Sequence, residues 1–179
     1  MLPNGKIIMS QLQPHQVIVL IGMPGAGKST IGPLLAKATL RDFIDTDLLI
    51  QAKHNRSLQD IVDKEGYQVL RELEEDVLLE SHFENRVIAT GGSVVYSEAG
   101  MRRLAGLGPI VHLDVCLAGL LARIKNYESR GIARKPGQSL ESLFEERQAL
   151  YHRYSDIRID CNNLSPEACV DEILRSLNQ

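Results

Sequence analysis

The chain has 179 residues and a formal net charge of −3, with 44% hydrophobic and 24% charged residues. This length suits one sizeable core, and the slightly acidic balance offers no basic field for nucleic acid or an anionic membrane surface. No apolar run approaches the length that spans a bilayer. We therefore expect a small-molecule partner, with neither nucleic acid nor membrane as partner.

Residues 1–16 lack the apolar core of a secretion signal, so we interpret them as a loose leader before a single domain at 17–179. The three cysteines are Cys116, Cys161 and Cys169. They lie far apart, without the spacing of a metal site, which is typical of buried thiols in a reducing compartment. The sequence thus predicts a cytoplasmic protein.

Short aliphatic runs alternate with longer stretches of helical period along the chain. This alternation is typical of βαβ units, in which helices cover both faces of a mostly parallel sheet. The expected strands are Val17–Gly22, Phe43–Asp45, Arg86–Thr90, Pro109–Val115 and Ile157–Cys161. The predicted fold class is α/β, a three-layer sandwich with a five-stranded parallel sheet.

The spacing of apolar residues predicts helices between these strands. They are expected over residues 28–39, 117–128, 139–155 and 165–177, with two more inside 57–83. Ser57 is the expected cap of the first helix in that pair, which breaks near Gly66. Pro33 should lie in or near the first turn of its helix, and Ser165 and Pro166 should begin the last one.

The stretch Gly22 to Ser29 reads GMPGAGKS and matches the phosphate-binding pattern GxxxxGK[ST] between a buried strand and a helix. Its glycines let successive backbone N–H groups surround an anion, Lys28 can reach the outer phosphates, and the Ser29 hydroxyl can bind Mg²⁺. The competing interpretation is an ordinary glycine-rich turn. We expect nucleoside triphosphate contacts from Gly25, Ala26, Gly27, Lys28, Ser29 and Thr30.

Two carboxylates, Asp45 and Asp47, flank Thr46 at the end of a predicted strand. Residues two apart on an extended chain face the same way. Beside a phosphate-binding loop, one carboxylate can serve a metal ion through water while the other accepts a hydrogen bond from an acceptor hydroxyl. Such a pair can also be a helix cap or a solvated turn.

From about Val17 to the C-terminus, the chain resembles the shikimate kinases, which have the P-loop fold of nucleoside-monophosphate kinases. The resemblance rests on the ordered motifs GMPGAGKSTIG, DTD (45–47), EGYQVLRELEEDVL (65–78), ATGGSVV (89–95) and ERQALY (146–151). It implies transfer of the ATP γ-phosphate to a hydroxyl of shikimate, with Mg²⁺. The cofactors expected from it are ATP and Mg²⁺.

The resemblance also assigns the acceptor site. It implies that Asp47, Arg71, Gly92 and Arg147 hold shikimate, with Asp47 orienting and deprotonating the hydroxyl. The backbone N–H groups of Gly91 and Gly92 can approach the ring because glycine has no Cβ. Two planar guanidinium groups can grip a carboxylate at two points each. The plainer interpretations are a surface pair of Arg71 with Glu75, a solvated position for Arg147, and an ordinary glycine turn.

The resemblance further implies Mg²⁺ on Ser29 and Asp45, catalysis by Lys28 and Arg130 beside Asp47, and nucleotide contacts from Arg123 and Arg130. Arg130 lies in SRGIARKPGQS (129–139), a basic segment rich in Gly and Pro. It falls within the predicted lid at about 127–139, because small-molecule kinases close a basic loop over the phosphates. Arg134 and Lys135 are alternatives to Arg130. A solvated loop without a catalytic role is the competing interpretation.

Two positions depart from the family pattern. Ser93 stands where the family has a third glycine, and RGIAR replaces its Arg-Pro-Leu-Leu lid sequence. The alternatives are therefore a kinase of another hydroxy acid or polyol, such as a gluconate-type kinase, and a non-catalytic nucleotide-binding regulator. A GTPase-type switch is disfavoured because the chain has no NKxD segment. We expect a monomer that binds a small carboxylate-bearing acceptor.

Overall fold

The computed structural model describes residues 16–124 and 131–179. Its centre is a five-stranded sheet in the order β2-β3-β1-β4-β5, in which every neighbouring pair is parallel. The strands are β1 (Ile18–Ile21), β2 (Asp42–Asp45), β3 (Arg86–Ala89), β4 (Ile110–Asp114) and β5 (Ile157–Asp160). Each predicted strand is confirmed to within one residue at either end.

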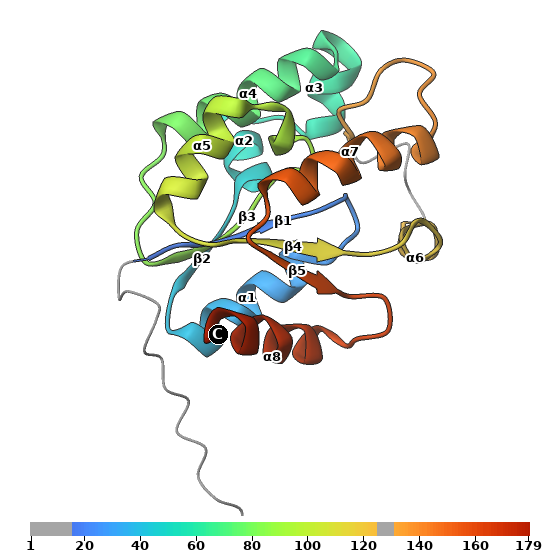
Figure 1. Ribbon diagram of the computed structural model, residues 1–179. Coiled ribbons are helices and arrows are strands. Elements are labelled where there is room, and N and C mark those ends of the chain that lie inside the picture. The colour runs from blue at the N-terminus through green and yellow to red at the C-terminus, as the bar shows by residue number, and fades with distance from the viewer. Residues whose placement is uncertain (1–15, 125–130) are drawn as a thin grey trace, which may run out of the picture.

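Helices cover both faces of this sheet. They are α1 (Lys28–Thr39), α2 (Thr46–His54), α3 (Leu58–Glu65), α4 (Tyr67–Glu80), α5 (Glu98–Leu107), α6 (Leu117–Arg123), α7 (Leu140–Tyr154) and α8 (Pro166–Leu177), with a 3₁₀ turn η1 (Val94–Tyr96). Figure 1 shows α1 and α8 below the sheet, and α2 to α5 with α7 above it. The predicted three-layer α/β sandwich is confirmed.

Two helices begin at the caps that the sequence predicts. The Ser57 side chain accepts a hydrogen bond from the Asp60 N–H, and Ser165 accepts one from the Ala168 N–H. These caps satisfy backbone donors that have no partner inside the helix. Pro33 lies inside α1, beyond its first turn, which corrects the expected position. The helix begins at Lys28, as predicted, directly after Gly27, which adopts a left-handed conformation.

Three elements have no counterpart in the sequence-based prediction, namely α2, η1 and α5. Helix α2 follows β2 directly, and the carboxylate of Asp45 caps it by accepting from the Asp47 N–H. Helix α5 is capped by Ser97, which accepts from the Gly100 N–H. The helix predicted over 117–128 ends at Arg123, because Ile124 departs from helical geometry. Residues 125–128 of that prediction lie outside the described residues.

The centre of the sheet is fully buried. Every residue of β1 and β4 is buried, and β1 lies between β3 and β4. Parallel strands end at the same edge, so the chain after β1, the chain after β2 and the chain after β3 come together there. This edge brings the phosphate-binding loop, Asp45 and the glycine turn at 90–92 close together in space.

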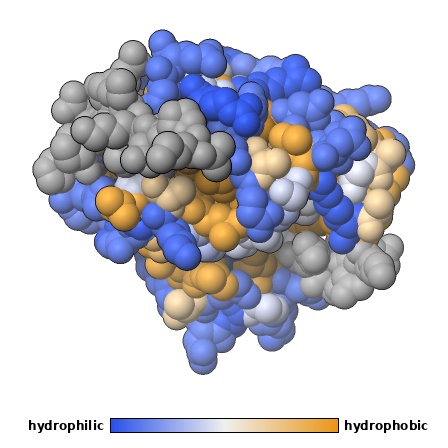
Figure 2. Space-filling model, turned by 90° about the horizontal axis from the view of Figure 1, so that it is seen from below, coloured by the Kyte–Doolittle hydropathy of each residue, from blue (hydrophilic) through white to orange (hydrophobic). Residues whose placement is uncertain are grey.

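The surface is mixed in polarity. Seen from below, apolar residues gather towards the middle of the face and polar residues surround them (Figure 2). Within residues 16–124 and 131–179, none of the helices combines the length and the apolar character required to cross a bilayer.

Candidate active site

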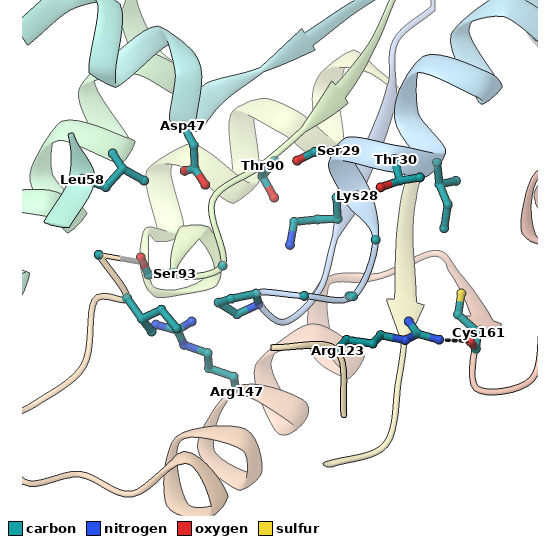
Figure 3. Close-up of a pocket in the computed structure, with 18 of the residues that line it drawn as sticks. Lys28, Ser29, Thr30, Asp47, Leu58, Thr90, Ser93, Arg123, Arg147 and Cys161 are labelled. Atoms are coloured by element: carbon teal, nitrogen blue, oxygen red, sulfur yellow. Dashed lines mark hydrogen bonds between the residues drawn. The ribbon is translucent and has the colours of Figure 1, made fainter. Parts of the chain in front are cut away.

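A cavity of about 710 Å³ opens at the carboxyl edge of the sheet. Residues 25–30, the whole predicted nucleotide-binding set of the P-loop, line it. Asp47, Gly92, Arg123 and Arg147 also line it, so the structure brings these predicted site residues to one place (Figure 3). Arg71 and Gly91 do not line this cavity, and Arg130 lies outside the described residues.

The P-loop has the conformation of an anion cradle. Gly22, Gly25 and Gly27 all have positive φ values, which residues other than glycine rarely adopt. A Cβ on Gly25 would lie 2.6 Å from Ile124 Cγ1, so the loop has no room for a larger residue there. Helix α1 begins without a side-chain cap and has no acidic residue in its first turn. Its N-terminus is therefore open to phosphate, and the loop fits a nucleoside triphosphate.

Lys28 lies folded against the loop that precedes it. Its Nζ donates to the carbonyl oxygens of Gly22 at 2.7 Å and Met23 at 3.0 Å. Burial lowers the pKa of Lys28 to about 8, while the carboxylates of Asp47 and Asp45 act in the opposite direction. The ammonium group is therefore held inside the cavity, against the P-loop (Figure 3).

Ser29 and Asp45, the predicted metal ligands, are in direct contact. Ser29 Oγ donates to Asp45 Oδ2 at 2.6 Å, and Asp45 Oδ1 accepts from the Asp47 N–H at 3.0 Å. No group of three or more His, Cys, Asp or Glu residues suited to a metal occurs among the described residues. A hydroxyl beside one carboxylate fits Mg²⁺, which usually combines few protein oxygens with water and substrate phosphates.

Asp47 carries an oxygen that has no partner. Its Oδ1 is buried and makes no hydrogen bond. Burial raises the pKa of Asp47 to about 6, and the negative charge of Asp45 adds to this effect. A carboxylate with a raised pKa and a free oxygen can accept both a hydrogen bond and a proton from a hydroxyl.

Glu74 on α4 is a site residue that the sequence analysis missed. It is 5% exposed and lines the main cavity. Burial raises its pKa to about 7, and the nearby Asp47 carboxylate contributes to the increase. A Cβ added to Gly91 would lie 2.8 Å from Asp47 Oδ1 and closer still to Glu74 Oε1, so both carboxylates reach the same glycine. The signal in the sequence was its spacing of three residues from Arg71, which places both on one helix face.

Ser93, which replaces the expected third glycine, is turned towards Glu74. Its hydroxyl donates to Glu74 Oε2, and the residue is 3% exposed. The Gly91 N–H donates to Thr46 Oγ1 at 3.1 Å, which corrects the expectation that this group is free to meet the acceptor. Gly92 lines the cavity, and its carbonyl accepts from the Tyr151 hydroxyl at 2.6 Å.

Arg147 lies deep in the cavity wall. It is 1% exposed, which excludes the solvated helix face that was its plainer interpretation. Its Nη2 donates to the Ala133 carbonyl at 2.7 Å, whereas its Nε is buried without a partner. A Cβ on Gly92 would lie 2.9 Å from Arg147 Nη1, so the guanidinium group reaches the glycine turn.

Arg71 lines a second cavity of about 450 Å³. Glu74 and Ser93 line both cavities, so the two are neighbours. The Arg71 Nε and Nη2 atoms are buried without partners. The alternative pairing with Glu75 does not occur in the described part of the chain, where the Glu75 carboxylate accepts from the Ser97 hydroxyl instead. Arg71 and Arg147 thus lie in adjoining cavities, both of which Ser93 also lines.

The other basic residues divide between the cavity and the surface. Arg123 lines the cavity and donates from Nη2 to the Cys161 carbonyl at 2.9 Å. Arg134 donates from Nη1 to the Gln138 carbonyl at 2.9 Å, and Lys135 Nζ lies 3.8 Å from Glu146 Oε2. Neither Arg134 nor Lys135 lines the cavity. Both side chains make contacts within or near the segment that joins α6 to α7.

Replacing Gly91 with alanine should destabilise the protein by about 1–3 kcal/mol, because the new methyl group would clash with the carboxylates of Glu74 and Asp47. The free energy of unfolding in urea measures this loss. Gly106→Ala on α5 is the matched control, since nothing lies within 4 Å of its added Cβ. Equal stability of the two variants would contradict the crowding at Gly91.

The raised pKa of Glu74 predicts how stability depends on pH. Between its usual value of 4.5 and about 7, folded Glu74 keeps a proton that the unfolded chain releases. The contribution of Glu74 to stability should therefore decrease as pH rises through this window. Glu74→Gln removes this dependence. The free energy of unfolding of the variant, relative to that of the wild type, should therefore increase as the pH rises from 4.5 to about 7. Parallel pH profiles in urea titrations would contradict the burial of this carboxyl.

Comparison with known proteins gives a consistent picture. A shikimate kinase from Sulfurihydrogenibium sp. (strain YO3AOP1) is 35% identical over 90% of this chain and 98% of its own. The solved shikimate kinase from Acinetobacter baumannii, in complex with shikimate, is similar with a TM-score of 0.82 and 30% identity, covering 90% of this chain and 92% of its own. The Aquifex aeolicus shikimate kinase structure gives a TM-score of 0.76 and 34% identity, covering 90% of this chain and 95% of its own.

The family model described as shikimate kinase matches residues 24–178. That range contains most of the P-loop, Asp45 and Asp47, the glycine turn, and the two arginines predicted to bind the acceptor. The resemblance noted from the motifs is therefore confirmed, and this chain belongs to the shikimate kinase family.

Proposed function

We propose that this protein transfers the γ-phosphate of ATP to a hydroxyl of shikimate. The observation that carries this proposal is a group of buried polar atoms without partners on the acceptor side of the P-loop. They are Nε and Nη2 of Arg71, Nε of Arg147 and Oδ1 of Asp47. Buried polar atoms rarely lack a partner, so this set matches a ligand that has both a carboxylate and a hydroxyl.

As a member of the shikimate kinase family, the chain is a phosphotransferase that uses ATP and Mg²⁺. ATP supplies the transferred phosphoryl group, and Mg²⁺ neutralises charge on its phosphates. In our proposal residues 25–30 and Arg123 bind the nucleotide, Ser29 and Asp45 hold the metal ion, and Lys28 stabilises the transferred group. Arg130 contributes to the nucleotide site from the segment 127–139, which acts as a lid.

On the acceptor side, Arg71 and Arg147 hold the carboxylate while Asp47 orients the hydroxyl and accepts its proton. The raised pKa of Asp47, about 6, supports this role, because a more basic carboxylate takes up a proton more readily at neutral pH. Gly92 gives the ring room beside the P-loop, and Gly91 gives Asp47 and Glu74 the space that their carboxylates occupy. The A. baumannii complex with shikimate supports the choice of acceptor.

An acceptor panel tests this function. The release of ADP from Mg-ATP is measured with shikimate, gluconate and other hydroxy acids at equal concentrations. We expect shikimate to stimulate ADP release above all the others. If gluconate stimulated ADP release as much as shikimate, the proposed acceptor would be wrong. If the rate with shikimate equalled the background rate with buffer, the kinase assignment for shikimate would be refuted.

We further propose that residues 17–179 form one kinase domain after a leader at 1–16. It would act as a cytoplasmic monomer without nucleic acid or membrane as a partner. The net charge of −3 supports the absence of nucleic acid. Light scattering coupled to size exclusion tests the monomer, and a mass of twice 19.9 kDa would contradict it.

A further inference from the structure

The aromatic ring of Tyr96 lies close to both Arg71 and Arg147. Tyr96 ends η1, directly after the glycine turn, and η1 packs against α4, α5 and α7. The guanidinium carbon Cζ of Arg71 lies 3.5 Å from the centre of the Tyr96 ring, and that of Arg147 lies 5.5 Å from it. One tyrosine is therefore within cation–π distance of both arginines.

The stacking on Tyr96 leaves the edge of the Arg71 guanidinium group free. An aromatic ring contacts the face of this planar group, whereas its N–H donors lie along the edge. The Nε and Nη2 atoms of Arg71 accordingly have no partner although they are buried. A carboxylate can therefore approach that edge while Arg71 stays stacked on the ring.

Several acidic residues line the second cavity together with Arg71. Glu72, Glu74, Glu75 and Asp76 line the same cavity. Glu74 accepts from the Ser93 hydroxyl and Glu75 from the Ser97 hydroxyl. In the part of the chain that the structure describes, no salt bridge to Arg71 is formed. The Tyr96 ring lies nearer to the Arg71 Cζ, at 3.5 Å, than the Tyr67 ring, at 5.0 Å.

The Tyr96 ring is itself held in place. Its hydroxyl donates to Glu146 Oε1 at 2.6 Å, and Glu146 Oε2 accepts from Gln138 Nε2 at 2.9 Å. Glu146 precedes Arg147 on α7, and Gln138 lies just before that helix. The orientation of the ring is thus tied to the helix that carries the second arginine.

We propose that Tyr96 is a positioning residue of the acceptor site, which supports the face of Arg71 so that its free edge can grip the acceptor carboxylate. Glu146 fixes the ring in that orientation. The inference rests on the proposed function, in which Arg71 and Arg147 hold this carboxylate. It adds a residue outside the motifs on which the family resemblance was based.

The test compares two acceptors in three proteins. The wild type, Tyr96→Leu and Tyr96→Phe are each assayed with shikimate and with its methyl ester, which keeps the ring and hydroxyls but lacks the negative charge. The KM for each acceptor, the KM for ATP and kcat are measured. Because KM does not depend on the fraction of active enzyme, partial misfolding of a variant does not mimic the effect.

For Tyr96→Leu we expect the KM for shikimate to rise about tenfold, while the KM for the ester and the KM for ATP change less than about twofold. Tyr96→Phe keeps the ring but loses the bond to Glu146, so the KM for shikimate should rise only about two- to threefold. Tyr154→Leu is the matched control. Tyr154 ends α7 and contacts Arg153, and its loss should leave the preference for shikimate over the ester unchanged.

The outcomes separate this inference from the proposed function. A wild type that does not prefer shikimate over its ester would refute the arginine grip, and the role of Tyr96 with it. A wild type with a clear preference that persists in Tyr96→Leu would overturn only the inference. An equal rise in KM for both acceptors in that variant would also overturn it, because the ring would then serve packing alone.

Discussion

Replacing Asp47 with asparagine should lower kcat by roughly 10²–10⁴-fold, the range typical of losing a general base. The amide keeps the size of the side chain, and the Asp47 N–H can still donate to Asp45. It cannot take up a proton from the acceptor hydroxyl. The KM for ATP should change by less than about threefold, since in the proposed function Asp47 contacts the acceptor rather than the nucleotide. Steady-state kinetics with varied shikimate and varied ATP measure both effects.

Asp42→Asn is the control for this substitution. Asp42 begins β2 and is exposed, whereas Asp47 follows the other end of that strand. The control should retain the kcat of the wild type. If Asp47→Asn also retained it, another group would have to deprotonate the hydroxyl, and Glu74, the neighbouring carboxylate, would be the first candidate.

The second large effect is expected from Lys28→Met, which should lower kcat by about 10²–10³-fold. Lys28 is 8% exposed, and its ammonium group donates to the carbonyl oxygens of Gly22 and Met23 in the P-loop, near enough to Asp47 and Asp45 for their charges to act on its pKa. Methionine fills similar space but supplies no positive charge as the phosphoryl group moves. Both the kcat and the KM for ATP should be affected, in a steady-state assay with varied Mg-ATP.

Lys37→Met provides the control on the same helix. Lys37 lies in the last turn of α1 and is exposed, so its charge is far from the P-loop end. This variant should behave as the wild type. A Lys28→Met enzyme with kcat within about threefold of the wild type would contradict the role of this ammonium group in the phosphoryl transfer.

The sheet and the P-loop could be predicted from the sequence because each depends on a local pattern. The buried strands are short aliphatic runs, and the phosphate loop needs glycine where φ is positive, as at Gly25 and Gly27. Ser57 and Ser165 act as caps for the same local reason. Such features need no knowledge of distant contacts.

The acceptor side could be predicted only in part because it depends on contacts between distant segments. The turn at Gly91 is crowded by Glu74 and Asp47, which come from two other elements. Tyr96 meets Arg71 on α4 and Arg147 on α7, and nothing in the local sequence indicates that meeting. Helix α2 was missed because Asp45 and Asp47 were interpreted as a strand end, whereas Asp45 caps the helix and Asp47 lies in its first turn.

Ser93 illustrates how a departure from the family pattern can be accommodated. Ser93 stands where the family has a third glycine, and it adds a Cβ and a hydroxyl at that position. In the structure its hydroxyl donates to Glu74, and Ser93 lines both cavities. The interpretation of residue 93 therefore depended on a partner on α4 that the local sequence could not reveal.

The most direct test of the account is a crystal structure of the protein with ADP, Mg²⁺ and shikimate. We expect the shikimate carboxylate within hydrogen-bond distance, about 2.7–3.2 Å, of nitrogen atoms of both Arg71 and Arg147. A ring hydroxyl should lie at a similar distance from Asp47 and face the P-loop. A carboxylate bound elsewhere, with both guanidinium groups still without an anion, would contradict the central claim.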